Sequence, residues 1–174
     1  MSLEETYLEH ILLHLRSNDP DDGVLTTYLN SWFAHQVGGD FLYRGRPRWL
    51  SRGSSKKLLA HRLHAISFAA REAHVQGRID DLVIDHAIPS AEIIRQLKTR
   101  RFESQKELRT YLKRTFTLAL LTKQEHDHTL KPFKSIMAED WNAEAFQADS
   151  SLRYCRYRHP STNIRFEIQH IHED

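Results

Sequence analysis

Two short apolar runs constrain the fold of this chain more than any other feature: DLVIDH at residues 81–86 and FTLALL at residues 116–121. Runs of about four to eight residues are typical of buried strands, whereas a buried helix needs a longer stretch. Elsewhere, apolar residues recur at the three- and four-residue spacing of amphipathic helices. The sequence therefore predicts an α+β fold that is mostly helical and contains a few short strands.

Capping patterns place the first helices. Ser2 and Glu5 have the spacing of a capping box, and the apolar residues that follow predict a helix that ends before the polar segment at residues 17–23. A second helix is expected to end at the glycine pair 38–39. The same signals predict further elements: helices at 55–76 (stopped by Gly77), 91–99 and 104–115, a short helix that begins at Thr122 and is limited by Pro132, and strands at 152–157 and 163–171.

The 174 residues have the length of a single domain. We divide it into an acidic helical part (1–40), a basic segment with a long helix (41–80), a central part (81–131) and C-terminal strands (132–174). No apolar run approaches the roughly 18 residues of a membrane span. We expect no export signal, because the N-terminus carries acids where a secretory signal would carry Lys or Arg. A single cysteine, Cys155, cannot form an internal disulfide, so we expect a buried structural thiol and a reducing, cytoplasmic compartment.

Positive charge is concentrated in the middle of the chain. Residues 41–114 contain seventeen basic and seven acidic side chains, whereas residues 1–40 contain one and seven, and residues 115–174 contain seven and nine. The net charge of +2 hides this asymmetry. A basic middle section between acidic flanks indicates a localised surface that faces a polyanion.

The strongest part of this basic section is residues 41–71, with eight Arg or Lys and no acid. Its arginines alternate, which would place them on one face of a strand, and further cations surround an expected helix start. Guanidinium groups and free helix N–H groups both suit phosphate oxygens. The expected nucleic-acid contacts are Arg44, Arg46, Arg48, Trp49, Arg52, Lys56 and Lys57. Alternatively, the acidic N-terminal helices balance this surface in space.

An acid and two histidines occur where the two apolar runs end. Asp85 and His86 close the first run. After the second run, Thr122 and Glu125 have capping-box spacing, so a helix should begin there and carry His126 in its first turn. A histidine at that position can point back over the strand that precedes it. These local patterns do not determine whether Asp85, His86 and His126 lie together in the fold.

These two segments, VIDHAIPS and LALLTKQEH, resemble the HNH, or ββα-metal, nuclease family. The resemblance implies a small ββα-metal-like core within residues 81–131. It also implies that His86 is the general base, that Asp85 and His126 bind one divalent cation (Mg²⁺, Mn²⁺, Ni²⁺ or Zn²⁺), and that the reaction is hydrolysis of a phosphodiester bond, in DNA rather than RNA. Both histidines must be neutral for these roles.

The chain differs from the family pattern at two supporting positions. Thr117 stands where the family usually has an Asn, and Leu130 stands where some members place a further His. His128 lies near His126 but does not share its face on a regular helix. The cysteine pairs that brace many members are missing, since the chain has one cysteine.

Two functional hypotheses therefore remain open from the sequence. One is a metal-dependent nuclease, for which a homodimer would allow two sites to cut two strands. The other is a non-enzymatic module, of a defence or counter-defence type, that binds nucleic acid or protein through charge. In the second case Asp85 and His86 are a strand cap with a structural role.

Overall fold

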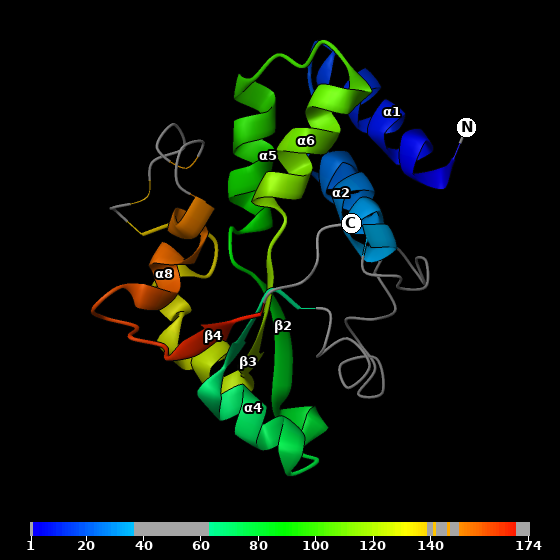
Figure 1. Ribbon diagram of the computed structural model, residues 1–174. Helices are drawn as coiled ribbons and strands as arrows, with labels where there is room; N and C mark the ends of the chain where they lie inside the picture. The colour runs from blue at the N-terminus through cyan, green and yellow to red at the C-terminus, as the bar shows by residue number, and fades with distance from the viewer. Residues whose placement is uncertain (1, 37–62, 139–140, 142–145, 147–149, 170–174) are drawn as a thin grey trace.

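The computed structural model describes residues 2–36, 63–138, 141, 146 and 150–169 (Figure 1). Within these ranges it confirms an α+β fold that is mostly helical, with a small four-stranded sheet. The predicted cations Arg44 to Lys57 and the end of the second helix at residues 38–39 lie outside the described residues.

The N-terminal helices form as the sequence predicts. Helix α1 (Leu3–Leu15) begins with a complete capping box: the Glu5 amide donates to the Ser2 hydroxyl at 3.2 Å, and the Ser2 amide donates to the Glu5 carboxylate at 2.7 Å. Helix α2 (Asp22–Gln36) packs against α1 and buries Trp32 and Phe33. These helices supply much of the main hydrophobic core.

The four strands are β1 (Ala65–Ser67), β2 (Leu82–His86), β3 (Leu118–Thr122) and β4 (Phe166–Ile168), in the order β2-β3-β1-β4. Strands β2 and β3 pair antiparallel, so that Asp85 lies opposite Ala119 and His86 opposite Leu118. Strand β1 pairs parallel to β3 and antiparallel to β4. Among the described strands, β2 is therefore an edge strand, and it carries the Asp-His pair.

Two helices connect β2 with β3: α5 (Ser90–Thr99) and α6 (Gln105–Thr115), both as predicted. They rise side by side from the sheet and pack against α1 and α2 (Figure 1). Each presents one apolar face to the core, and the buried residues of these faces are Ile93, Ile94, Leu97, Leu108, Tyr111 and Leu112. Because β2 and β3 are paired, the end of β2 lies next to the start of β3, although about thirty residues separate them along the chain.

The two faces of the sheet pack against different parts of the molecule. Successive strand side chains point to opposite faces. Ile84 and Leu120 belong to the core that contains α1 and α2, whereas Ala119 and Leu121 pack with Tyr157 and other C-terminal residues. Asp85 consequently faces the C-terminal segment, and His86 faces α2.

The predicted long helix at 55–76 is wrong in its described part. Residues 65–67 form β1, and only Phe68–Val75 form a helix, α4. The reason is tertiary, because Ala65 and Ile66 are buried between β3 and β4 and use their backbone groups in the sheet. The predicted stop at Gly77 is confirmed: α4 ends at Val75, and Gly77 has a φ of 74°, which favours glycine.

The predicted strand at 152–157 is also wrong. Residues Ser150–Tyr154 form a 3₁₀ helix, η6, and Cys155–Arg158 form a short helix, α8. Three consecutive side chains, Cys155 to Tyr157, are buried, which an alternating strand with one solvent face would not allow. Of the predicted strand at 163–171, β4 occupies Phe166–Ile168. The C-terminal part is therefore helical as well as extended.

The short helix expected between Thr122 and Pro132 has a different form. Residues Glu125–Thr129 make a π-helical turn, η4, and Lys131–Phe133 make a 3₁₀ turn, η5. As expected, η4 ends at Thr129, before Pro132, and Pro132 lies in the separate turn η5, where proline is tolerated near the start of a helical turn. Among the described residues, no helix has both the length and the apolar character needed to cross a membrane.

Candidate metal and phosphodiester site

Asp85 lies near the end of β2 and is held by two donors from the C-terminal segment. The exposed fraction of Asp85 is 8%. Its Oδ2 accepts one hydrogen bond from Arg156 Nη2 at 2.5 Å and one from the Tyr157 hydroxyl at 2.6 Å. The other carboxylate oxygen of Asp85, Oδ1, is directed toward His126. One oxygen of this carboxylate is therefore saturated by hydrogen bonds within the chain, and the other faces the candidate site.

The guanidinium of Arg156 connects three parts of the molecule. It donates from Nε to the Ala87 carbonyl at 2.9 Å, from Nη1 to the Phe133 carbonyl at 2.8 Å, and from Nη2 to the His86 carbonyl as well as to Asp85. Arg156 is 1% exposed. Such a fully bonded guanidinium fixes the end of β2 against η5 and α8.

The protonation states of this network follow from its burial and charges. Burial disfavours the charge of Arg156, but the neighbouring Asp85 and Tyr157 outweigh it, so the pKa of Arg156 is raised. Burial, with Asp85 close by, raises the pKa of Tyr157 well above its usual value. At neutral pH Arg156 is therefore charged and Tyr157 keeps its proton as a hydrogen-bond donor.

His126 lies between two carboxylates. Its Nδ1 is 2.8 Å from Asp127 Oδ1, and its Nε2 is 3.8 Å from Asp85 Oδ1. Lys134 Nζ contacts the same Asp127 oxygen at 3.2 Å. The hydrogen bonds from His126 and Lys134 lower the pKa of Asp127, so this carboxylate is ionised. The structure thus brings His126 and Asp85 together, a proximity that the sequence patterns left open.

This arrangement leaves His126 Nε2 available for a cation. A neutral imidazole carries one N–H, and the short contact with Asp127 places it on Nδ1. The lone pair of Nε2 then points at an anionic oxygen of Asp85, and two acceptors at that separation favour a positive charge between them. A carboxylate that accepts from the other ring nitrogen is the usual support of a metal-binding histidine. Protonation of His126 is the alternative way to satisfy both carboxylates.

The turn that carries His126 is anchored by Glu125. The Glu125 carboxylate accepts hydrogen bonds from the Thr122 amide at 2.8 Å, the Thr122 hydroxyl at 3.0 Å and the Ser67 hydroxyl at 2.6 Å. In return, the Glu125 amide donates to the Thr122 hydroxyl at 3.1 Å. The capping box predicted at Thr122 and Glu125 is therefore present, and it is tied to β1 through Ser67.

His86 lies on the opposite face of the sheet from Asp85 and His126. Its ring packs on Phe33 of α2 with 5.1 Å between ring centroids. Its Nε2 is buried and has no hydrogen-bond partner among the described residues. Burial lowers the pKa of His86 to about 4, although Asp85 raises it in part. His86 is therefore neutral at neutral pH, but the structure does not bring its ring into the cluster of Asp85 and His126.

Thr117 and His128, the two residues that the sequence offers as supports of the site, have distinct environments. Thr117 is buried, and its hydroxyl accepts a hydrogen bond from Arg153 Nη1 at 2.9 Å. Its carbonyl accepts from the Ala87 amide at 2.9 Å, which extends the pairing between the ends of β2 and β3. His128 is exposed in η4. Thr117 thus stabilises the ends of β2 and β3 beside the site, and His128 lies at the surface.

The donor set fits a divalent cation with two protein ligands. Asp85 Oδ1 and His126 Nε2 offer one carboxylate and one imidazole, a pair that suits Mn²⁺, Ni²⁺ and Zn²⁺ and, through the carboxylate, Mg²⁺. Within the described residues, no third His, Cys, Asp or Glu completes a group that could hold a metal ion. Water and substrate phosphate oxygens would have to fill the remaining positions, as is common for Mg²⁺.

Arg156 and Tyr157 are the important site residues that sequence reasoning missed. They lie 71 and 72 residues from Asp85, and no local pattern connects the two segments. The strand expected at 152–157 would also have pointed the two side chains in opposite directions. The one available signal was a dense alternation of arginine and tyrosine in LRYCRYR, which could not show that Arg156 is buried.

Comparisons with known proteins identify no relative of this chain. The resemblance to HNH nucleases consequently depends on the two motifs and on the positions of their residues in the fold. No protein-family model, curated protein or solved structure matches this chain.

Proposed function

We propose that this protein is a metal-dependent, HNH-like nuclease that hydrolyses phosphodiester bonds of DNA, and that Asp85 and His126 hold its divalent cation. The observation that carries the proposal is the contact of His126 between Asp127 and Asp85, with Nε2 facing Asp85 Oδ1 at 3.8 Å. Two acidic groups around one imidazole in a partly buried cluster are typical of a metal site.

The order of elements supports the same proposal. Strand β2 ends with the Asp-His pair, β3 pairs with it antiparallel, and the turn after β3 carries His126. This succession of strand, strand and helical turn is the arrangement that the resemblance implies for a ββα-metal core. The insertion of α5 and α6 lengthens the connection but leaves the pairing of β2 and β3 intact.

Each residue of the cluster has a separate task in this proposal. Asp85 and His126 bind the cation, Asp127 holds His126 in the tautomer that exposes Nε2, and Arg156 with Tyr157 fixes the orientation of the Asp85 carboxylate. When bound, a divalent cation supplies Lewis-acid stabilisation of the charge that develops on the phosphate. Because Arg156 already neutralises part of the charge on Asp85, we expect cation affinity to be modest.

The resemblance implies that His86 is the general base. Its neutral imidazole has the protonation state that a base requires. Its ring, however, packs on Phe33, on the α2 side of the sheet. Loss of cleavage in His86→Ala with unchanged cation binding would support the base role. Equal losses of stability and cleavage would instead assign His86 to the core.

A second candidate function is a non-enzymatic module that binds nucleic acid or protein through charge. The buried network of Arg156, Tyr157 and Asp85 favours it, because a carboxylate saturated on Oδ2 by an internal cation serves the fold without any metal. The position of the His86 ring on Phe33, away from the side chains of this network, favours it too. In this case Asp85 and His86 have a structural role, as in the second of the two hypotheses from the sequence.

A cleavage assay separates the two candidates. Supercoiled plasmid and single-stranded DNA would be incubated in EDTA, Mg²⁺, Mn²⁺, Ni²⁺ or Zn²⁺ with wild type, Asp85→Asn, His126→Ala and His128→Ala. We expect metal-dependent nicking that is lost in the first two variants and retained in His128→Ala, which removes an exposed imidazole from the same turn. Absence of cleavage with every metal, together with salt-dependent binding of DNA, would favour the binding module.

A further inference from the structure

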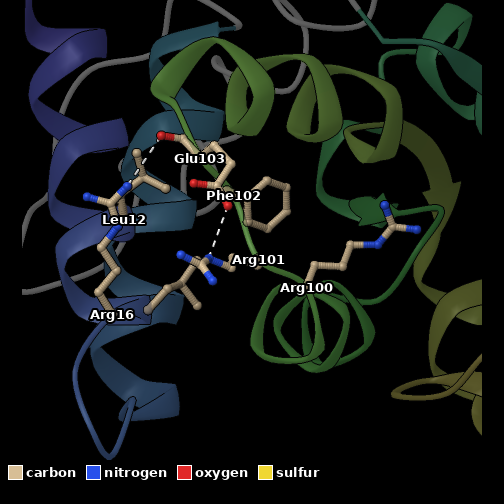
Figure 2. Close-up of a pocket in the computed structure, with 7 residues that line it drawn as sticks. Leu12, Arg16, Arg100, Arg101, Phe102 and Glu103 are labelled. Atoms are coloured by element: carbon tan, nitrogen blue, oxygen red, sulfur yellow. Dashed lines mark hydrogen bonds and ion pairs between the residues drawn. The ribbon is translucent and has the colours of Figure 1, made fainter.

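A pocket of about 450 Å³ lies between the C-terminal end of α1 and the connection from α5 to α6 (Figure 2). Three arginines line it: Arg16 from α1 and Arg100 and Arg101 from the connection. Figure 2 shows Arg16 and Arg101 directed toward Glu103 on one side of Phe102, with Arg100 on the other side. The pocket is therefore built from two segments that are far apart in the sequence and that both contribute positive charge.

A second pocket of about 410 Å³ adjoins the first and shares Arg100 and Phe102 with it. It adds Lys106, Arg114 and Glu107 from α6. The two pockets together are lined by five cationic side chains and two carboxylates. We call this surface the α5–α6 basic pocket.

The two carboxylates are already engaged. Glu103 contacts Arg101 at 3.0 Å, and the Glu107 carboxylate accepts a hydrogen bond from the Glu103 amide at 2.9 Å. Within the described part of the chain, Arg16 donates to a backbone oxygen, the Glu103 carbonyl, at 3.5 Å. Arg100 lies over the Tyr111 ring at 5.1 Å and pairs with no carboxylate of the described residues. Five cations against two carboxylates leave a surplus of positive charge on this surface, and within the described residues neither Arg16 nor Arg100 pairs with a carboxylate.

The floor of the pocket indicates what kind of ligand it takes. Phe102 and Tyr111 pack against each other and are 6% and 7% exposed, so their rings are too enclosed for bases to stack on them. Recognition then depends on the guanidinium groups, which donate paired hydrogen bonds to phosphate oxygens. A ligand with closely spaced phosphates satisfies this chemistry best.

We propose that the α5–α6 basic pocket binds phosphate groups, and that the backbone of a nucleic-acid strand is their source. The connection from α5 to α6, which contributes to both pockets, lies at the end of these helices that points away from the sheet (Figure 1). The ten residues of α5 separate it from the end of β2 by roughly 15 Å. The α5–α6 basic pocket is therefore a binding site additional to Asp85 and His126 and does not depend on the proposed cation.

Binding of a fluorescent 20-base-pair DNA duplex, measured by anisotropy in EDTA over a range of NaCl concentrations, tests the proposal. In the double variant Arg100→Ala with Arg101→Ala we expect affinity to fall by roughly tenfold and the log–log salt slope to decrease by about two, since two phosphate contacts are removed. The matched control, Arg71→Ala with Arg78→Ala, removes two half-exposed arginines from another region and should leave both quantities unchanged. The single variant Arg16→Gln removes a third cation of the pocket and is measured in the same way.

Calorimetric titration with pyrophosphate identifies the source of the phosphate. Loss of duplex affinity in the pocket variants assigns it to a nucleic-acid backbone. Unchanged duplex affinity with loss of pyrophosphate binding assigns it to a small phosphate ligand. If neither the duplex nor pyrophosphate distinguishes the pocket variants from the control, the proposal is overturned. Because EDTA is present in the duplex experiment, the result is separate from any failure to find metal-dependent cleavage.

Discussion

At the scale of single residues, Arg156 has the largest structural role in the candidate site. Its guanidinium neutralises Asp85 and satisfies carbonyl groups at the end of β2 and in η5. Removal of one partner of a buried ion pair leaves the other charge without compensation, which costs more than the pair contributes when intact. Substitutions at this residue therefore separate stability from cation binding.

We predict that Arg156→Met lowers the free energy of unfolding by about 3–5 kcal/mol, because Asp85 is left buried without its counterion. Addition of Asp85→Asn to this variant should recover part of the loss. Urea denaturation checks both values. The exposed neighbour Arg158→Met is the control and should change stability by less than about 1 kcal/mol, since its guanidinium lies at the surface over the Tyr154 and Phe166 rings. A similar cost for the two arginines would contradict the role of Arg156.

His86 makes stability depend on pH in a predictable direction. Burial depresses its pKa to about 4 in the folded chain, below the usual value near 6.5 in the unfolded chain. Between these values the unfolded chain binds the proton and the folded chain does not, so stability is lost as pH falls from about 6.5 toward 4. From pH 7 to pH 5 the wild type should lose roughly 2 kcal/mol more than His86→Phe, in urea denaturation at each pH. Parallel pH curves for the two proteins would rule out this assignment.

At the scale of elements, Ser67 couples β1 and α4 to the turn that carries His126. Its hydroxyl accepts from the Ala70 amide at 3.0 Å as the cap of α4 and donates to Glu125 at 2.6 Å. Ser104 has a comparable capping position at α6, where it accepts from the Glu107 amide at 3.2 Å. The two serines therefore form a matched pair: both cap helices, but only Ser67 contacts η4.

We predict that Ser67→Ala and Ser104→Ala each lower the free energy of unfolding by about 1 kcal/mol through the lost cap. Ser67→Ala should in addition weaken Mn²⁺ binding several-fold, because Glu125 and the turn with His126 lose a support. Denaturation together with Mn²⁺ titration measures both effects. Equal Mn²⁺ affinity in the two variants would show that Ser67 does not position His126.

The elements differ in how far local sequence determines them. Helices α1, α5 and α6 follow from caps and apolar spacing, and β2 and β3 follow from short bounded apolar runs. Strand β1 does not, because the leucines and isoleucine around it also fit a helical period and only pairing with β3 and β4 selects the extended form. The helical form of Cys155–Arg158 depends in the same way on distant contacts, those that bury Arg156 and Tyr157.

At the scale of the whole molecule, the sheet separates the two halves of the Asp-His motif. The capping box at Thr122 was predictable because it is a local signal, whereas the approach of Asp85 to His126 also requires β2 to pair with β3 across about thirty residues and was left open by the sequence. The position of His86 on the α2 face follows from strand alternation alone, but its burial against Phe33 depends on how α2 packs. The charge balance of Asp85 was not predictable, since Arg156 comes from a segment 71 residues away.

Direct titration with Mn²⁺, followed by calorimetry in the absence of nucleic acid, tests the central claim that Asp85 and His126 hold a divalent cation. The account predicts one site per chain, with binding lost in His126→Ala and in Asp85→Asn and unchanged in His128→Ala. Wild-type protein that binds no Mn²⁺, or that binds it equally well without His126, would contradict the claim and leave the buried contact of Asp85 with Arg156 and Tyr157 as a structural feature of the fold.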